Sequence, residues 1–177
     1  MKTALKISAV VLALLGSVTA FAQSVMGAAD AVPVESAVDG RKLPGVWDCV
    51  VPMPVSASGA TISIRGHATY NANGTVVHED RVIQTTPGGK PVEVSLVGLS
   101  DWSFSKENNH LYETLKKVSI QFDKTNPQAA LMGVQMDKNY QAAVGVRQSS
   151  TVVRLNDKEW NSLMLNETLA VVCERAK

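Results

Sequence analysis

The stretch "GVWDCVV", residues 45–51, decides the fold because it combines a strand pattern with one of only two cysteines in the chain. Trp47, Cys49 and Val51 alternate with the other residues and would share one face of a strand. The second cysteine, Cys173, lies in "LAVVCERAK" at the far end of the chain. Two cysteines in an oxidising compartment usually pair, so we predict a disulfide between Cys49 and Cys173.

The beginning of the chain has the layout of a secretory signal peptide. Lys2 and Lys6 precede an apolar run over residues 7–20, and Ala20-Phe21-Ala22 forms a small-x-small cleavage site before Gln23. The apolar run is short for a membrane span, although an uncleaved anchor is the alternative. We therefore expect residues 1–22 to be removed and the rest of the chain to be periplasmic or secreted.

The mature chain divides into a leader and one domain. Residues 23–43 are small, rich in Ala and Val and without periodicity, which predicts a loosely ordered leader. Residues 44–177 are long enough for a single domain with its own core. The chain has 17 basic and 16 acidic residues, and loss of the two signal-peptide lysines leaves a net charge near −1. This balance argues against binding to nucleic acid or to an anionic membrane surface.

The domain reads mostly as strands. Ile62, Ile64, Ala68 and Tyr70 recur at every second position, and "NANG" at 71–74 supplies a turn in which Gly74 can adopt a positive φ. The predicted strands cover residues 45–51, 60–70, about 75–84, 92–98, 101–105, 110–122, 150–156, 159–165 and 168–175. Within 110–122 the apolar residues change face, which predicts a β-bulge near Lys116-Lys117.

One helix is expected between the predicted strands over 110–122 and 150–156. Asn126 can cap its N-terminus and Pro127 suits the first turn, while Met132, Met136 and later apolar residues recur at a spacing of four. Eight or nine strands in serial order with one inserted helix predict a mostly all-β fold, an antiparallel up-and-down barrel or half-barrel. Closure of a barrel makes the first and last strands neighbours, so the disulfide would join them.

The same pairing brings two further residues together. If Cys49 and Cys173 are opposed in antiparallel strands, Trp47 faces Arg175, and a guanidinium over an indole is a favourable cation–π contact. Gly45, Trp47 and Arg175 resemble the signature of the lipocalin-like (calycin-like) barrels, with Arg154 as a competing candidate for the arginine. A departure is that the helix here precedes the last three strands. The resemblance implies an apolar ligand in the mouth of the barrel.

No catalytic motif, metal site or cofactor site is found in the sequence. His67 and His78 flank the 71–74 turn; they would be opposed with a four-residue loop, whereas one bulged residue would place His67 beside Glu79. Met132 and Met136 are better explained by helix packing than by copper ligation. No nucleophile context is present, and the adjacent carboxylates Glu79 and Asp80 point to opposite faces of a strand, so we do not expect an enzyme.

Two functional hypotheses remain. The first is a non-enzymatic binding protein that holds a small apolar ligand, lined by Ile62, Ile64, Tyr70 and Val171, with the helix over 127–144 as a lid or plug. Its alternative is a barrel filled by its own side chains, because eight strands enclose little more space than that. The second hypothesis is a protein–protein interaction module of the cell envelope that uses the loops at 52–59 and 84–91.

Overall fold

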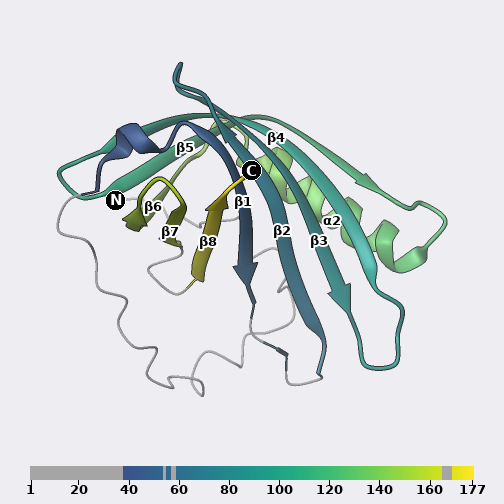
Figure 1. The fold of residues 1–177 in the computed structure, drawn as a ribbon. Helices are drawn as coiled ribbons and strands as arrows, with labels where there is room; N and C mark the ends of the chain where they lie inside the picture. The colour runs from purple at the N-terminus through teal and green to yellow at the C-terminus, as the bar shows by residue number, and fades with distance from the viewer. Residues whose placement is uncertain (1–37, 54, 57–58, 165–168) are drawn as a thin grey trace, which may run out of the picture.

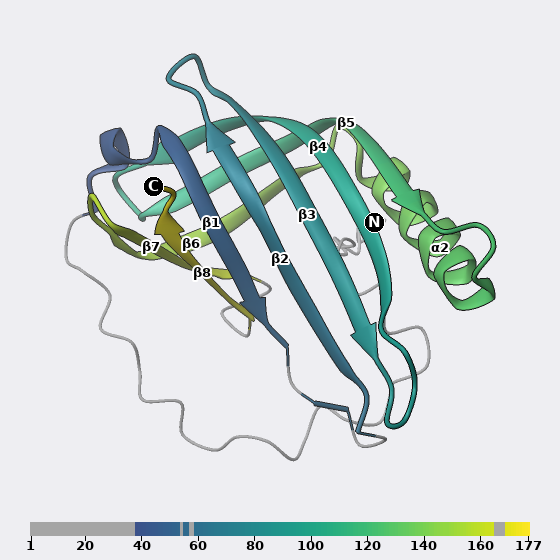
Figure 2. The ribbon, with the colours of Figure 1, turned by 45° about the vertical axis from the view of Figure 1, so that its right-hand side comes forward.

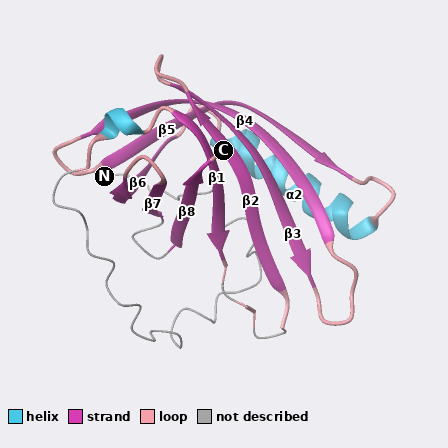
Figure 3. Cartoon of the chain, viewed as in Figure 1, coloured by secondary structure: helices cyan, strands magenta, loops and turns pink. Residues whose placement is uncertain are grey.

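A computed structural model describes residues 38–53, 55–56, 59–164 and 169–177, and shows a closed antiparallel barrel whose strands follow one another in sequence order (Figures 1 and 3). The predicted fold class, mostly β with one inserted helix, is confirmed. The predicted signal peptide and residues 23–37 of the leader lie outside the described residues. The strands are β1 (Gly45–Pro52), β2 (Thr61–Tyr70), β3 (Thr75–Thr85), β4 (Val92–Ser105), β5 (His110–Phe122), β6 (Arg147–Leu155), β7 (Glu159–Met164) and β8 (Leu169–Arg175).

The structure corrects one strand division. Strand β4 is a single element, whereas the sequence predicted a break at Leu99-Ser100 between two shorter strands. Ser100 is buried and faces the barrel interior, so its polarity reflects a polar interior position and not a turn. The alternation of buried and exposed residues runs through this point without interruption.

The predicted β-bulge is present on the neighbouring strand. Leu99 pairs with Lys117 and Ser100 pairs with Leu115, which leaves Lys116 as an extra residue of β5. The bulge changes which residues of β5 face inward. As a result, β5 directs apolar side chains into the barrel on both sides of the bulge. Leu111 and Leu115 do so before it, and apolar residues of the helix-packed half do so after it.

Strands β1 and β8 form the seam that closes the barrel. Cys49 is opposite Cys173 in the register and joined to it by a disulfide with an S–S distance of 2.06 Å, across a sequence separation of 124. Trp47 is opposite Arg175 in the same ladder, as the sequence predicted. The disulfide therefore joins the first and last strands of the sheet, whose pairing closes the barrel.

Helix α2 (Pro127–Ala143) packs beside the part of β5 that does not pair with β6. Strand β6 pairs only with residues 110–114 of β5, and α2 packs against β5 and β4 where no such partner strand exists (Figure 2). The Asn126 side chain accepts hydrogen bonds from the backbone N–H groups of Gln128 and Ala129, which confirms the predicted cap. Among the described residues, no helix is both long enough and apolar enough to cross a membrane.

The packed part of the chain begins before the expected boundary at Pro44. Asp39 caps a short 3-10 helix, Gly40–Lys42, by accepting a hydrogen bond from the Arg41 N–H. Val38 and Leu43 are buried in the apolar core. The end of the predicted leader, residues 38–43, thus covers one end of the barrel.

Candidate functional site

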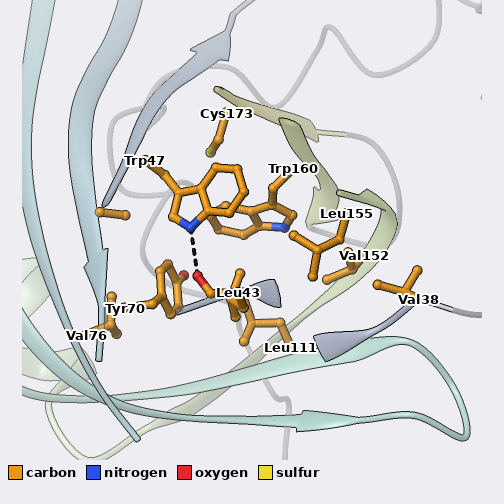
Figure 4. Packing of buried hydrophobic residues seen from close by; sticks show 11 residues of the cluster. Val38, Leu43, Trp47, Tyr70, Val76, Leu111, Val152, Leu155, Trp160 and Cys173 are labelled. Carbon is orange, nitrogen blue, oxygen red and sulfur yellow. Dashed lines mark hydrogen bonds between the residues drawn. The ribbon is translucent and has the colours of Figure 1, made fainter. Parts of the chain in front are cut away.

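The first layer of the barrel interior is an apolar cluster at the end covered by residues 38–43, here called the closed-end cluster (Figure 4). The Trp47 and Trp160 rings meet edge to face with centroids 6.1 Å apart, and Trp160 meets Tyr70 in the same way at 5.3 Å. The indole N–H of Trp47 donates a hydrogen bond of 2.8 Å to the carbonyl of Leu43. The buried members of the cluster are Val38, Leu43, Trp47, Ala68, Tyr70, Val76, Leu111, Val152, Leu155, Trp160 and Cys173.

Arg175 covers this end from outside. Its guanidinium carbon lies 4.1 Å from the centre of the Trp47 ring, and its Nη1 and Nη2 donate to the carbonyls of Pro44 (2.8 Å) and Lys42 (2.7 Å). Gly45 has φ 138°, and a Cβ there would lie 2.0 Å from Nη1 of Arg175, so only glycine fits. The three residues of the predicted barrel signature therefore form one contact group.

Arg154, the competing candidate, is engaged elsewhere. Its Nη1 lies 3.0 Å from Oε1 of Glu159, and both side chains are partly exposed. The sequence could not choose between the two arginines because both lie in predicted strands near the C-terminus. The register of β8 against β1 decides for Arg175.

A second apolar cluster lies at the other end of the barrel, where α2 packs, and is called the helix-side cluster below. Its buried residues are Val82, Val92, Val94, Ala129, Met132 and Met136. Met132 and Met136 therefore serve packing, as predicted from their spacing on the helix. Ile62, predicted to line a ligand site, packs against this cluster and is not among the residues that line the cavity.

Between the two clusters the barrel contains a cavity of about 200 Å³ that is partly open to solvent. Ile64, Tyr70 and Val171, all predicted as lining residues, form part of its wall, and Tyr140 of α2 forms another part. The cavity is walled by all eight strands and by α2. Its lining comprises Cys49, Val51, Ile64, Gly66, Ala68, Tyr70, His78, Asp80, Leu96, Gly98, Ser100, Leu111, Glu113, Leu115, Tyr140, Gln148, Ser149, Ser150, Trp160, Ser162, Met164, Leu169 and Val171.

Small residues create this space. Ala68 and Gly98 occupy inward positions on β2 and β4, where larger side chains would fill the barrel. Ala68 and Gly98 flank His78 on its two sides in the sheet. A Cβ on Gly98 would lie 3.6 Å from Leu115 and 3.7 Å from Leu96, which is ordinary contact. Glycine at position 98 is therefore not required by sterics, and its effect is to leave the space open.

Four side chains form a polar cluster in the wall of the cavity: Tyr70 from β2, His78 and Asp80 from β3, and Glu113 from β5. The Tyr70 hydroxyl donates to Oε1 of Glu113, and Nε2 of His78 lies 3.0 Å from Oε2 of the same carboxylate. Both oxygens of Glu113 are thus engaged. The His78 and Glu113 side chains are 23% and 26% exposed, so solvent reaches them through the cavity.

The charges of this cluster are coupled. Burial alone lowers the pKa of His78, but the Glu113 carboxylate and the charge of Asp80 outweigh burial and raise the pKa to about 9. Burial raises the pKa of Glu113, whereas the His78 charge and the hydrogen bonds from His78 and Tyr70 bring it below its usual value. Hence His78 is a cation and Glu113 an anion at neutral pH.

Asp80 differs from Glu113 in its surroundings. Burial raises its pKa, and the nearby Glu113 carboxylate adds to this effect, while the charge of His78 opposes it. Burial also raises the pKa of the Tyr140 hydroxyl, and the charge of Asp80 contributes to that rise, which places α2 within electrostatic reach of this carboxylate. In the described parts of the chain, no side chain or backbone group donates a hydrogen bond to the Asp80 carboxylate.

The register of β2 and β3 settles the arrangement of the two histidines. His67 pairs with Glu79, and Ala68 pairs with His78, so the turn contains the bulged residue and Gly74 has φ 85°. His78 points into the barrel, while His67 lies outside and pairs with Asp48. Within the described residues, no three His, Cys, Asp or Glu side chains gather as a metal site would require.

Sequence analysis missed the polar cluster apart from Tyr70. A signal was present, because His78 and Asp80 are separated by two and share the face of Val76 and Val82. Glu113 likewise shares the face of Leu111 and Leu115. Polar residues at apolar-face positions on two strands indicate a polar patch inside the barrel. That Glu113 meets His78 follows only from the stagger of the closed sheet.

Of the two loops predicted as protein contacts, the structure describes only one completely. The 84–91 loop connects β3 to β4, whereas the 52–59 loop lies in part outside the described residues.

Comparison of the sequence with models of protein families and with curated proteins finds no match to either. The class of protein therefore rests on the architecture. The chain is a small closed antiparallel barrel of eight strands, with a calycin-like topology and an internal cavity.

Proposed function

We propose that this chain is an exported, lipocalin-like binding protein that holds one small and mostly apolar molecule inside its barrel. The observation that carries the proposal is the cavity of about 200 Å³ between the two apolar clusters. An eight-stranded barrel is narrow enough for its own side chains to fill. A barrel that leaves this volume unfilled has the form expected of a ligand-binding barrel.

The residues around the cavity support a ligand over a packing irregularity. Empty volume in a core lowers stability, and glycine inside a strand lowers it further. Gly98 does both next to partly buried ionisable groups, whose partial desolvation is also unfavourable. Ionisable groups of shifted pKa that gather in a cavity are a feature of functional sites more than of structural cores.

The volume limits the size of the ligand. A dry apolar cavity of about 150 Å³ is large enough for a benzene molecule, and sites for drug-sized molecules reach about 300–1,000 Å³. A cavity of about 200 Å³ therefore suits a molecule with one ring or a short chain. Long fatty acids and multi-ring compounds would require the barrel or α2 to move.

Export is supported by two independent features. The first is the predicted signal peptide over residues 1–22, with cleavage between Ala22 and Gln23. The second is the disulfide, because such bonds persist in oxidising compartments. We further propose that the ligand leaves the barrel chemically unchanged, as for a carrier and not an enzyme.

Binding of a neutral single-ring probe tests the proposal. Calorimetric titration with 2-phenylethanol should show one equivalent bound to the wild type. Gly98→Leu extends a side chain into the cavity from a position where its Cβ fits, so we expect at least tenfold weaker binding with an unchanged or higher Tm. Probe recovered after long incubation should be unaltered by mass.

A matched control lies one residue away on the same strand. Val97 is 41% exposed on the outer face of β4, so Val97→Leu adds apolar bulk outside the barrel and should bind as the wild type does. Equal binding by Gly98→Leu and the wild type would place the probe elsewhere. Absence of binding to the wild type across a series of small probes, neutral and charged, would overturn the proposal.

A further inference from the structure

The charge balance of the cavity is negative. Its described lining contains two carboxylates, Asp80 and Glu113, and one base, His78, while it contains no lysine or arginine. The ion pair between His78 and Glu113 is internally satisfied at 3.0 Å. Asp80 is therefore the group whose charge has no dedicated partner in the lining.

The position of Asp80 explains why its charge stays uncompensated. Its neighbours across the sheet are Gly66 on β2 and Leu96 on β4, neither of which carries a side-chain donor. A Cβ on Gly66 would lie 2.0 Å from Oδ1 of Asp80, so the carboxylate rests against bare backbone where a side chain would otherwise stand. The charge of His78 favours the ionised form of Asp80, but His78 is already paired with Glu113.

Burial without a hydrogen-bond donor makes an ionised carboxylate unfavourable, and the raised pKa of Asp80 has this cause. A cation placed beside it would remove that penalty, because charge pairs are strong where water is partly excluded. An anion in the same space would meet two carboxylates and find its only cation already paired. The cavity therefore discriminates between ligands by the sign of their charge.

The rest of the lining suits an apolar body attached to such a cation. Leu96, Leu115 and Val171 supply aliphatic wall, and the Tyr140 ring lies within electrostatic reach of Asp80. Aromatic rings accept cations on their faces as well as apolar groups. A compact ligand could thus place its charged end at Asp80 and its apolar end against these side chains.

From this arrangement we propose that the barrel is selective for small primary amines in their protonated form, a single ring or short chain that ends in an ammonium group, with Asp80 as the counter-ion. The inference rests on the proposed binding function and names its ligand class. It assigns different roles to the two carboxylates: Glu113 orders His78 and Tyr70, and Asp80 receives the ligand.

Three probes of matched shape test this inference on the full mature chain at neutral pH: 2-phenylethylamine, 2-phenylethanol and phenylacetate. We expect the amine to bind at least tenfold more tightly than the alcohol, and phenylacetate to bind more weakly than the alcohol. Asp80→Asn should bring the affinity for the amine down to that for the alcohol while leaving alcohol binding within about twofold. Glu79→Gln removes an equal charge from the exposed outer face of the same strand and should leave the preference intact.

The outcomes separate this inference from the proposed function. If the alcohol binds and the amine binds no better, the selectivity proposal is wrong and the proposed binding function stands. If phenylacetate binds most tightly, the counter-ion is His78 and the assignment of Asp80 is wrong. If none of the three binds to the wild type, the proposed function itself fails. Retention of the amine preference in Asp80→Asn would also overturn the role given to Asp80, whatever the wild-type affinities.

Discussion

The closed end and the middle of the barrel interior differ in how tightly their side chains pack. At the closed end, Trp47, Tyr70 and Trp160 pack edge to face, and Arg175 of β8 holds the segment that precedes β1 by donating to two of its carbonyls. In the middle of the barrel, by contrast, glycine and alanine stand at inward positions and partly buried ionisable groups face the cavity. The closed end is therefore densely packed, whereas the middle of the barrel leaves volume unfilled.

This difference separates the residues that hold the barrel closed from those that give it a use. Changes at the seam and closed end should lower stability and leave the shape of the cavity intact in the protein that remains folded. Changes around the cavity should alter binding and ionisation with smaller effects on folding. Stability and binding should be measured on the same variants. If every variant changed both properties in parallel, this division of roles between the two regions would be wrong.

The largest effect is expected at the seam. Replacing both Cys49 and Cys173 with serine frees the ends of a loop of about 125 residues, for which the chain-entropy relation gives a loss of about 4–5 kcal/mol. For a protein of this size that corresponds to a fall in Tm of about 10–20 °C. Thermal melts followed by circular dichroism would measure it.

Wild-type protein melted in the presence of a reductant is the matched control and should show a similar fall. A double variant that melts within two or three degrees of the oxidised wild type would show that the hydrogen bonds between β1 and β8 close the barrel without help from sulfur. Probe binding at low temperature, where both proteins are folded, should be unchanged.

Arg175 should give the next largest effect. Arg175→Met keeps much of the apolar stem but removes three charge-assisted hydrogen bonds to backbone carbonyls and the contact with Trp47, so we expect a loss of about 2–4 kcal/mol in the free energy of unfolding. Arg175→Lys should recover less than half of this, because one ammonium group cannot replace a planar fork. Urea unfolding curves would provide the values.

Arg81 supplies the comparison for this second prediction. Its Nε lies 3.8 Å from Glu93 on the outer face and its side chain is 69% exposed, so Arg81→Met should cost less than about 1 kcal/mol. If both methionine variants lost the same small amount, Arg175 would be an ordinary surface residue and the closed end would not depend on it.

The same contrast explains how far the sequence could be interpreted. The closed end was predictable because its determinants are local patterns and one covalent constraint: alternation in 45–51, the change of face near Lys116, and two cysteines whose pairing fixes the register of Trp47 against Arg175. The helix was equally local, since Asn126 and Pro127 mark its start.

The cavity was not predictable in the same way. Inward positions of His78 and Asp80 follow from strand alternation, but their relation to Glu113 depends on the stagger of strands β3 to β5 around a closed sheet. Empty volume depends on the sum of all inward side chains, and Gly98 adds to it by lacking a side chain where one would fit. Ile62 was assigned to the cavity because alternation tells which face a residue occupies and not how far along the barrel it lies.

The smallest effect is expected from the ionisation of His78, and it tests whether the polar cluster is as tightly coupled as its geometry indicates. The folded-state pKa of about 9 lies above the ordinary value of 6.5, so His78 contributes stability that is fully present below pH 6.5 and is lost as the pH rises through 9. His78→Gln removes this titration. This shift alone corresponds to roughly 3 kcal/mol, but the His78 side chain is 23% exposed and solvent screens part of its interaction with Glu113. The difference in unfolding free energy between the wild type and this variant should therefore fall by about 1–2 kcal/mol between pH 6.5 and 9.5.

The variant curve cancels the contributions of groups that titrate alike in both proteins. Proton NMR of the imidazole gives a direct check, because His78 should remain protonated at pH 8 in the wild type and lose its proton at lower pH in Glu113→Gln, where burial acts without its main counter-charge. A wild-type His78 that titrates near pH 6.5 would mean that solvent in the cavity screens the pair. The middle of the barrel would then be a wet pore, and the contrast with the closed end would be one of hydration more than of charge.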